Sequence, residues 1–224
     1  MVMGGPTRVN VCFHGIGIPG RELEPGEAPY WVSHDTFLGV LDAIAGDDRV
    51  RISFDDANAS DMVHGLPALL ARGLTATFFV LAGRLDQPGS LGSDDVRALA
   101  AAGMTIGTHG MAHRPWRGLT PAESRRELED ARDVIAGVIG APVDQAALPL
   151  GRYDRRLLRE LRRLGYTAVH TSDRRWAHEG SWLQPRFSVV SSDTGASVRT
   201  SVLGRQAPAR QAERHLVGAI KRWR

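Results

Sequence analysis

Short apolar runs alternate with amphipathic stretches along most of the chain. Runs rich in β-branched and aromatic residues are typical of strands. They lie at 8–13, 50–54, 74–81, 104–108, 145–148 and 166–171, with a weaker candidate at 187–190. Apolar residues at helical spacing predict helices between them, at 33–46, 62–72, 93–103, 120–140 and 155–164. Residues 14–32 are rich in Gly, Pro and Glu and predict a long loop.

Capping residues support several of these helices. Ser33 is a candidate N-cap, Ser93 opens a second capping sequence, and Thr120 to Glu123 form a capping box with proline at the first helical position. Strands that alternate with helices imply βαβ units and a parallel sheet. We expect an α/β fold, a distorted (β/α) barrel of about seven strands, with an open doubly wound sheet as the alternative. We expect one domain over residues 1–224, ending in a basic amphipathic helix at about 208–224.

The composition is that of a soluble globular protein. The 224 residues are 42% hydrophobic and 24% charged, which excludes disordered, collagen-like and coiled-coil classes. The single cysteine, Cys12, excludes a disulfide framework and a cysteine-based zinc site. No apolar run is long enough to span a membrane, and the first residues lack the features of a signal peptide, so we expect a cytoplasmic protein. The arginines are interleaved with acids, which does not favour nucleic-acid binding.

Two predicted strands end in residues with metal-binding chemistry. Asp55 and Asp56 follow one strand, and His109 and His113 follow another. Taken alone, the aspartates are equally well explained as a helix cap, and an isolated His-x-x-x-His pair is more often a surface feature. Active sites of parallel α/β folds lie at the carboxyl ends of the strands, so the combination predicts a metal site with an open position for water.

Several motifs resemble the polysaccharide deacetylases, also called the NodB-homology or carbohydrate esterase family four. Ser53 to Asp56 is similar to the family's Thr-Phe-Asp-Asp motif, and His109 to His113 to its His-(Ser/Thr)-x-x-His motif, with Gly110 as a departure. Residues 74–80 resemble its Ala-Thr-Phe-Phe strand, and residues 147–154 its Pro-Tyr-Gly block. The resemblance runs from about residue 8 to residue 190 in the family's order.

The resemblance implies a role for each matching residue. Asp56, His109 and His113 would hold a divalent metal, usually zinc, and Asp55 would be the general base. The backbone N–H of Leu150, where the family has tyrosine, would stabilise the oxyanion. The implied fold is a distorted (β/α) barrel, in agreement with the pattern of strands and helices.

Two departures leave roles open. Many members carry an arginine in the third motif that steadies the base, but Ala147 stands there. Arg186 is a candidate substitute, although it is also readily explained as a surface arginine. The late Leu-x-His motif that supplies the general acid in many members is absent, and only His215 follows residue 190. Phe13-His14 resembles a branch in which an early histidine is the acid; the alternative for His14 is a structural loop residue.

We therefore expect a metal-dependent hydrolase that removes an N-acyl group, in particular N-acetyl, from an amino sugar or a glycan. One alternative is an intracellular deacylase of a small-molecule or lipid-linked amide. Another is a non-catalytic carbohydrate-binding domain, which the presence of all four metal-site and base residues argues against.

Overall fold

Seven parallel strands close into a barrel in the computed structural model, which describes residues 7–204. Each strand pairs with the next, and the last returns to pair with the first. The ring consists of β1 (Thr7–Phe13), β4 (Val50–Phe54), β5 (Ala76–Val80), β6 (Thr105–Thr108), β7 (Gln145–Ala147), β8 (Ala168–Thr171) and β10 (Leu183–Ser188). The closed ring confirms the barrel that the sequence predicts and excludes the open doubly wound sheet.

The first strand, β1, closes the ring by pairing with β4 on one side and with β10, the last strand, on the other. Val11 pairs with Ile52 on β4 and with Phe187 on β10, so β1 lies between these strands. A two-residue strand, β9 (Ala177–His178), pairs antiparallel with the start of β1. Residues from β4 and β10 can therefore meet inside the barrel although they are far apart in sequence.

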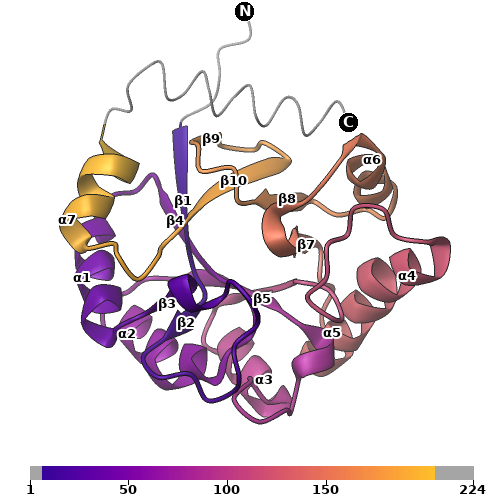
Figure 1. Ribbon diagram of the computed structural model, residues 1–224, viewed down its shortest axis with the longest axis horizontal. Helices are drawn as coiled ribbons and strands as arrows, with labels where there is room; N and C mark the ends of the chain where they lie inside the picture. Colours follow the sequence, from indigo (N-terminus) through magenta and orange to yellow (C-terminus); the bar gives the residue numbers. More distant parts are fainter. Residues whose placement is uncertain (1–6, 205–224) are drawn as a thin grey trace, which may run out of the picture.

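Helices follow one another around the outside of the ring (Figure 1). They are α1 (His34–Ile44), α2 (Leu66–Leu70), α3 (Ser93–Ala101), α4 (Pro121–Arg125), α5 (Ala131–Ile139), α6 (Arg155–Arg163) and α7 (Gly195–Val198). Two predicted caps are present: Ser33 Oγ accepts from the Thr36 amide at 3.0 Å, and Thr120 forms a capping box with Glu123. π-Helical segments, η2 (Asp61–Gly65) and η4 (Arg126–Asp130), continue into α2 and α5.

An aromatic cluster fills the space between the ring and its helices. The rings of Phe54 and Phe78 stack with centroids 4.7 Å apart, and Phe13 lies 5.5 Å from Phe54 and 5.0 Å from Phe37 of α1. Successive residues of a strand point to opposite faces. The next residue, Phe79, accordingly contacts a different set of side chains, with its centroid 4.7 Å from the ring of His170.

Three expectations about local structure need correction. The predicted loop 14–32 contains a small parallel pair, β2 (Gly15–Ile16) with β3 (Trp31–Val32). The last barrel strand begins at Leu183, not near 187, because Gln184, Pro185 and Arg186 mask its apolar pattern. The N-cap of α3 is Gly92, whose amide donates to the Asp95 carboxylate at 2.8 Å, and Ser93 is already helical.

The predicted basic helix at 208–224 and His215 lie outside the described residues. Within 7–204, no helix combines the length and the apolar character that a membrane span requires.

Candidate active site

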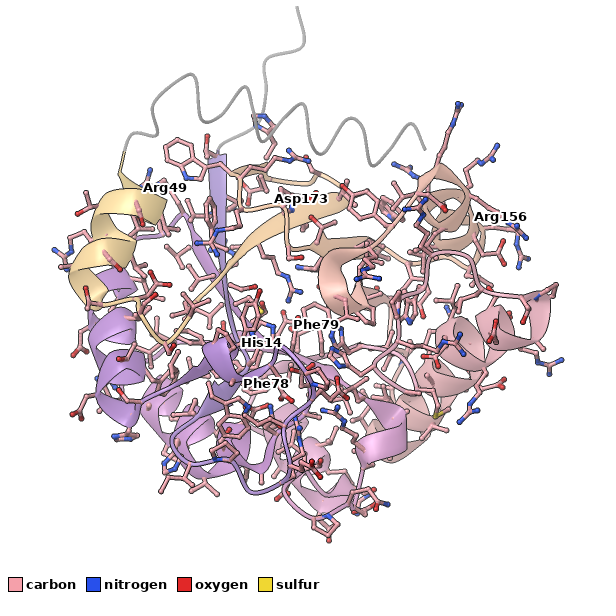
Figure 2. The ribbon with its side chains drawn as sticks, in the orientation of Figure 1. His14, Arg49, Phe78, Phe79, Arg156 and Asp173 are labelled. Atoms are coloured by element: carbon pink, nitrogen blue, oxygen red, sulfur yellow. The ribbon has the colours of Figure 1, made fainter. Side chains whose placement is uncertain are left out.

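The predicted site residues gather at the carboxyl ends of the barrel strands. Asp55 and Asp56 follow β4, His109 follows β6, and His14 follows β1. Figure 2 shows His14 near the middle of the molecule. An open cleft of ≈ 380 Å³ lies over these strand ends. It is lined by His14, Glu24, Pro25, Gly26, Glu27, Tyr30, Asp56, His109, His113, Leu148, Leu150, Gly151, Arg152, Ser172 and Ser188.

Asp56, His109 and His113 converge in a geometry that fits a divalent metal. Asp56 Oδ1 lies 3.5 Å from His109 Nε2 and 3.4 Å from His113 Nε2. The three ligand atoms lie within 4.8 Å of one another. Asp56 Oδ1 is buried and has no hydrogen-bond partner among the described residues. A buried carboxylate oxygen without a donor is costly, so a cation between these three atoms would satisfy it.

The hydrogen bonds of both histidines leave their Nε2 atoms free for a metal. His109 Nδ1 lies 2.9 Å from the carbonyl oxygen of Ala147, which can only accept, so Nδ1 carries the proton. His113 Nδ1 lies 2.6 Å from the carboxylate of Glu24, which imposes the same tautomer. Burial lowers the pKa of His109 to about 4, although Asp55 and Asp56 act in the opposite direction. His109 is therefore the neutral imidazole that metals bind.

The backbone of the site is locally strained. Asp56, His113 and Leu150 adopt φ values of 76°, 42° and 56°. This left-handed region is uncommon for residues other than glycine, and it persists only where the surrounding structure enforces it. Three of the six non-glycine residues with positive φ among residues 7–204 therefore belong to the site; the others are Ala57, Asp86 and Arg174.

Arg186 is buried inside the barrel and paired with Asp55. It is only 2% exposed, so its explanation as a surface arginine is wrong. Its two terminal nitrogens donate to the two oxygens of Asp55 at 2.6 and 2.7 Å, and one also donates to Ser53 Oγ at 3.1 Å. Burial alone would raise the pKa of Asp55, but the charge and hydrogen bonds of Arg186, together with His109 and His14, hold that pKa well below its usual range. Asp55 is therefore an ionised, fixed carboxylate.

His14 lies beside Asp55. Its Nε2 is 4.0 Å from Asp55 Oδ2, and the same oxygen is 3.9 Å from His109 Nε2. The imidazole packs against the ring of Tyr30, with centroids 4.9 Å apart, and lines the cleft. The structure thus brings His14 into the site, next to the expected base. Its role as general acid stays a prediction.

Leu150 lies at the edge of the cleft in a short turn, Pro149–Gly151, after β7. The residue is 55% exposed, in spite of its apolar character. The left-handed conformation of Leu150 belongs to the turn that bounds the cleft. This position is compatible with the expected role of its backbone N–H, which also stays a prediction.

The loop between the two histidines is held by a carboxylate that sequence reasoning missed. Glu127 of η4 is 1% exposed and accepts hydrogen bonds from the amides of Met111 at 2.8 Å and Ala112 at 3.3 Å. Gly110 has φ +90°, and a Cβ there would lie 2.7 Å from Glu127 Oε2 and 2.8 Å from Trp116 Nε1. The departure at Gly110 is therefore required by the packing of Glu127 and Trp116.

Glu24 was missed as well, because nothing in its loop marks it. It lies in the stretch of Gly, Pro and Glu at 14–32, which has no periodicity, and its partner His113 is 89 residues away. Glu127 lies inside a long helical pattern, where an acidic residue indicates only a solvent-facing position. Only the folded structure reveals that both carboxylates face the same loop.

Comparison with known proteins points to one family. The model of the family described as polysaccharide deacetylase matches residues 43–169. The matched stretch contains Asp55, Asp56, His109, His113 and Leu150, whereas His14 and Arg186 lie outside it. YxkH of Bacillus subtilis, itself only provisionally assigned as a polysaccharide deacetylase, is 26% identical over 124 residues, which are 55% of this chain and 44% of YxkH. The match thus spans less than half the length of that relative.

Solved structures share the fold. A polysaccharide deacetylase from Bacillus cereus superposes with a TM-score of 0.76 at 16% identity, over 88% of this chain and 69% of its own. The Streptococcus pyogenes deacetylase PplD, solved in complex with acetate, superposes with a TM-score of 0.77 at 18% identity, over 88% of this chain and 99% of its own. At these identities the likeness establishes the barrel and does not extend to substrates.

Proposed function

The chain belongs to the polysaccharide deacetylase family, and from this we propose that it is a metal-dependent hydrolase that removes an N-acetyl group from an amino sugar or a glycan. One observation carries the proposal. The imidazoles of His109 and His113 converge on the buried, unpartnered Oδ1 of Asp56, and this group lies beside the ionised Asp55. A metal site next to a fixed carboxylate, open to a cleft, is the arrangement that amide hydrolysis needs.

Asp56 Oδ1, His109 Nε2 and His113 Nε2 would hold the metal. Two imidazoles and one carboxylate match the ligands of catalytic zinc sites, so zinc is the metal we propose. When bound, it would supply Lewis-acid chemistry, activating water and polarising the amide carbonyl. The burial that keeps His109 neutral leaves its Nε2 available as a ligand at neutral pH.

Asp55 would accept the proton of the attacking water. Its oxygens are anchored by Arg186, so the carboxylate cannot rotate, and Oδ2 is the oxygen that faces His14 and His109. Arg186 lowers the pKa of Asp55 and so keeps the buried group ionised at neutral pH, the form that can accept a proton, although a lower pKa also makes the carboxylate a weaker base. A positioned base of this kind contributes roughly 10²–10⁴-fold to the rate.

His14 would protonate the leaving amine, and the N–H of Leu150 would stabilise the oxyanion. The amine must gain a proton as the tetrahedral intermediate collapses, and imidazole is the side chain best suited to supply one near neutral pH. His14 lines the cleft and its Nε2 lies 4.0 Å from Asp55 Oδ2, which supports a role in proton transfer there. A backbone donor at the oxyanion is worth roughly 3–4 kcal/mol in a dry site.

Two other functions remain candidates for the test. A small-molecule or lipid-linked amide would use the same site, and an exposed Leu150 at the cleft edge is compatible with an apolar portion of such a substrate. A non-catalytic carbohydrate-binding domain has no need for the buried pair of Asp55 and Arg186, which costs desolvation energy. The proposed cytoplasmic location bears on which substrates the protein meets.

Metal content and product formation test the proposal together. Purified protein should contain about one equivalent of zinc or another divalent ion by elemental analysis. Incubation with N-acetylglucosamine, its short oligomers and small N-acyl amides should release acetate from one class, and a chelator should stop the reaction. Bound metal without turnover on any amide, in a protein that binds the oligomers, would support the non-catalytic alternative. Absence of metal from protein reconstituted at neutral pH would refute the site.

A further inference from the structure

The metal ligand His113 forms a hydrogen bond with Glu24, which lies in the segment between β2 and β3. Glu24 Oε2 lies 2.6 Å from His113 Nδ1, at the edge of the imidazole opposite to the one facing Asp56. We propose that Glu24 is a positioning residue for the metal site, which fixes the tautomer and orientation of His113. This inference rests on the proposed metal-dependent function, since it concerns how that site is built.

His113 needs this partner more than His109 does. The ring of His109 donates to the backbone carbonyl of Ala147, which the adjacent strand β7 holds in place. His113 follows the strand by several residues, and its backbone is in the left-handed region. Within the described residues, Glu24 is the hydrogen-bond partner of its Nδ1. Without that carboxylate, the imidazole could carry its proton on Nε2, the atom that must be bare to bind a metal.

Glu24 itself is firmly placed. Its carboxylate forms an ion pair with Arg84, whose side chain is largely buried. Its backbone amide donates to Glu27 Oε2 at 2.8 Å. Glu27 is in turn held by Arg21, through a hydrogen bond of 3.0 Å to the same oxygen, and by the indole of Trp31 at 3.2 Å. The carboxylate is therefore oriented before any metal arrives, which is what an outer partner of a metal ligand requires.

The loop of residues 15–31 thus has two roles at once. Glu24, Glu27 and Tyr30 line the cleft in which substrate would lie. The same loop supplies the hydrogen bond that prepares His113. Movement of this loop away from the strand ends would remove Glu24 from His113, so metal affinity and loop position are thermodynamically linked.

Metal affinity is the direct readout. Dissociation constants for Zn²⁺ should be measured in competition with a chromophoric chelator, for the wild type and for Glu24→Ala, Glu24→Gln and Glu22→Gln. Glu22 is exposed on the same loop, so its variant removes one negative charge without touching His113. We expect Glu24→Ala to bind Zn²⁺ roughly 10–100-fold more weakly. The Zn²⁺ dissociation constant of Glu24→Gln should lie between those of the wild type and Glu24→Ala, because the glutamine amide oxygen still accepts from Nδ1. The constant of Glu22→Gln should match that of the wild type.

The tautomer of His113 distinguishes a specific effect of Glu24 on the imidazole from a general loosening of the loop. Long-range ¹⁵N correlation spectra of the metal-free proteins should show Nδ1 protonated in the wild type and mixed protonation in Glu24→Ala. Melting temperatures in the presence of chelator check that each variant is folded.

The outcomes distinguish the two proposals. Wild-type protein that binds no Zn²⁺ would overturn the metal site and this inference with it. Wild-type protein that binds Zn²⁺, with a Glu24→Ala constant within about twofold of it and an unchanged His113 tautomer, would overturn the inference alone. Equal weakening in Glu24→Ala and Glu22→Gln would also overturn it, since it would reduce the effect to net charge.

Discussion

Arg186 on β10 and the Asp55 that follows β4 form a two-pronged ion pair across the strand that lies between them, β1. The pair exists only because the barrel closes, since β10 and β4 are brought together by their common neighbour. The family resemblance would place an arginine beside Asp55 from position 147, where this chain has alanine. The arginine that contacts Asp55 comes from the last strand of the ring.

Asp55→Asn should abolish turnover while metal content survives. The asparagine keeps the shape of the carboxylate but cannot take up the proton of the attacking water. The rate should fall by roughly 10²-fold or more, measured as acetate release by protein of known metal content. Asp94→Asn, at an exposed carboxylate on α3, is the matched control and should retain the wild-type rate. A variant with more than about a tenth of the wild-type rate would assign the base to another residue.

Arg186→Met should destabilise the fold strongly. It leaves the carboxylate of Asp55 buried without its partner, which typically costs about 3–5 kcal/mol. Urea unfolding at neutral pH measures the loss. The double variant Arg186→Met with Asp55→Asn should recover much of the stability, because the stranded charge is gone. If the single and double variants were equally unstable, packing rather than the ion pair would explain the loss.

His14→Ala should lower the rate by roughly 10²–10⁴-fold without loss of metal. The leaving amine would then lack its proton donor, whereas the proposed metal would keep all three of its ligands. His14 belongs to a separate group of possible ligand atoms, with Cys12 and Asp55, so an unchanged metal content also shows that the metal does not bind there. Steady-state measurements at saturating substrate would place the loss in kcat. His34→Ala, at an exposed histidine on α1, is the control. A His14→Ala enzyme of wild-type rate would restore the alternative of a structural loop histidine.

Acid should remove stability through Glu27. Burial on its own would raise the pKa of Glu27, but hydrogen bonds from Arg21, the Glu24 amide and the Trp31 indole lower it from the ordinary 4.5 to about 2. Because the folded-state pKa lies below the unfolded one, the stabilisation is complete above about pH 4.5 and is lost as the pH falls toward 2. The advantage of wild type over Glu27→Gln in unfolding free energy should shrink by roughly 2 kcal/mol between pH 6 and pH 3.

Urea titrations of both proteins at these two pH values measure this difference. Glu22→Gln, on the same loop, corrects for the loss of one negative charge. A gap between wild type and Glu27→Gln that stays constant with pH would contradict the assignment of the stabilisation to the ionised carboxylate.

The parts of the site that the sequence predicts are those that depend on short-range order. Asp55 with Asp56, and His109 with His113, are neighbours in sequence and follow strong strand patterns. Once parallel strands are inferred, their carboxyl ends share one edge, so convergence follows without knowledge of side-chain packing. The same reasoning yields the barrel, because alternation of strands and helices is a repeated local signal.

The parts that escape prediction depend on contacts across the closed barrel. Arg186 is 131 residues from Asp55, and its strand carries polar residues that hide the apolar pattern. Glu24 depends on the path of a loop held by an internal network of Arg21, Glu27 and Trp31, which no periodicity encodes. The roles of His14 and Leu150, the basic helix at 208–224 and the cytoplasmic location stay predictions.

The close packing at Gly110 restricts which residues can replace both Gly110 and Glu127. The Cβ of a serine at 110 would lie 2.7 Å from Glu127 Oε2. The same oxygen already accepts hydrogen bonds from the amides of Met111 and Ala112. A serine at 110 would displace the carboxylate of Glu127. Loss of Glu127 would leave the amides of Met111 and Ala112 without their acceptor. Loss of Glu127 would not by itself admit a side chain at 110, because a Cβ there would still lie 2.8 Å from Trp116 Nε1 and the φ of +90° favours glycine. Glycine at 110 is therefore fixed by three separate features of the loop: its backbone conformation, the indole of Trp116 and the carboxylate of Glu127.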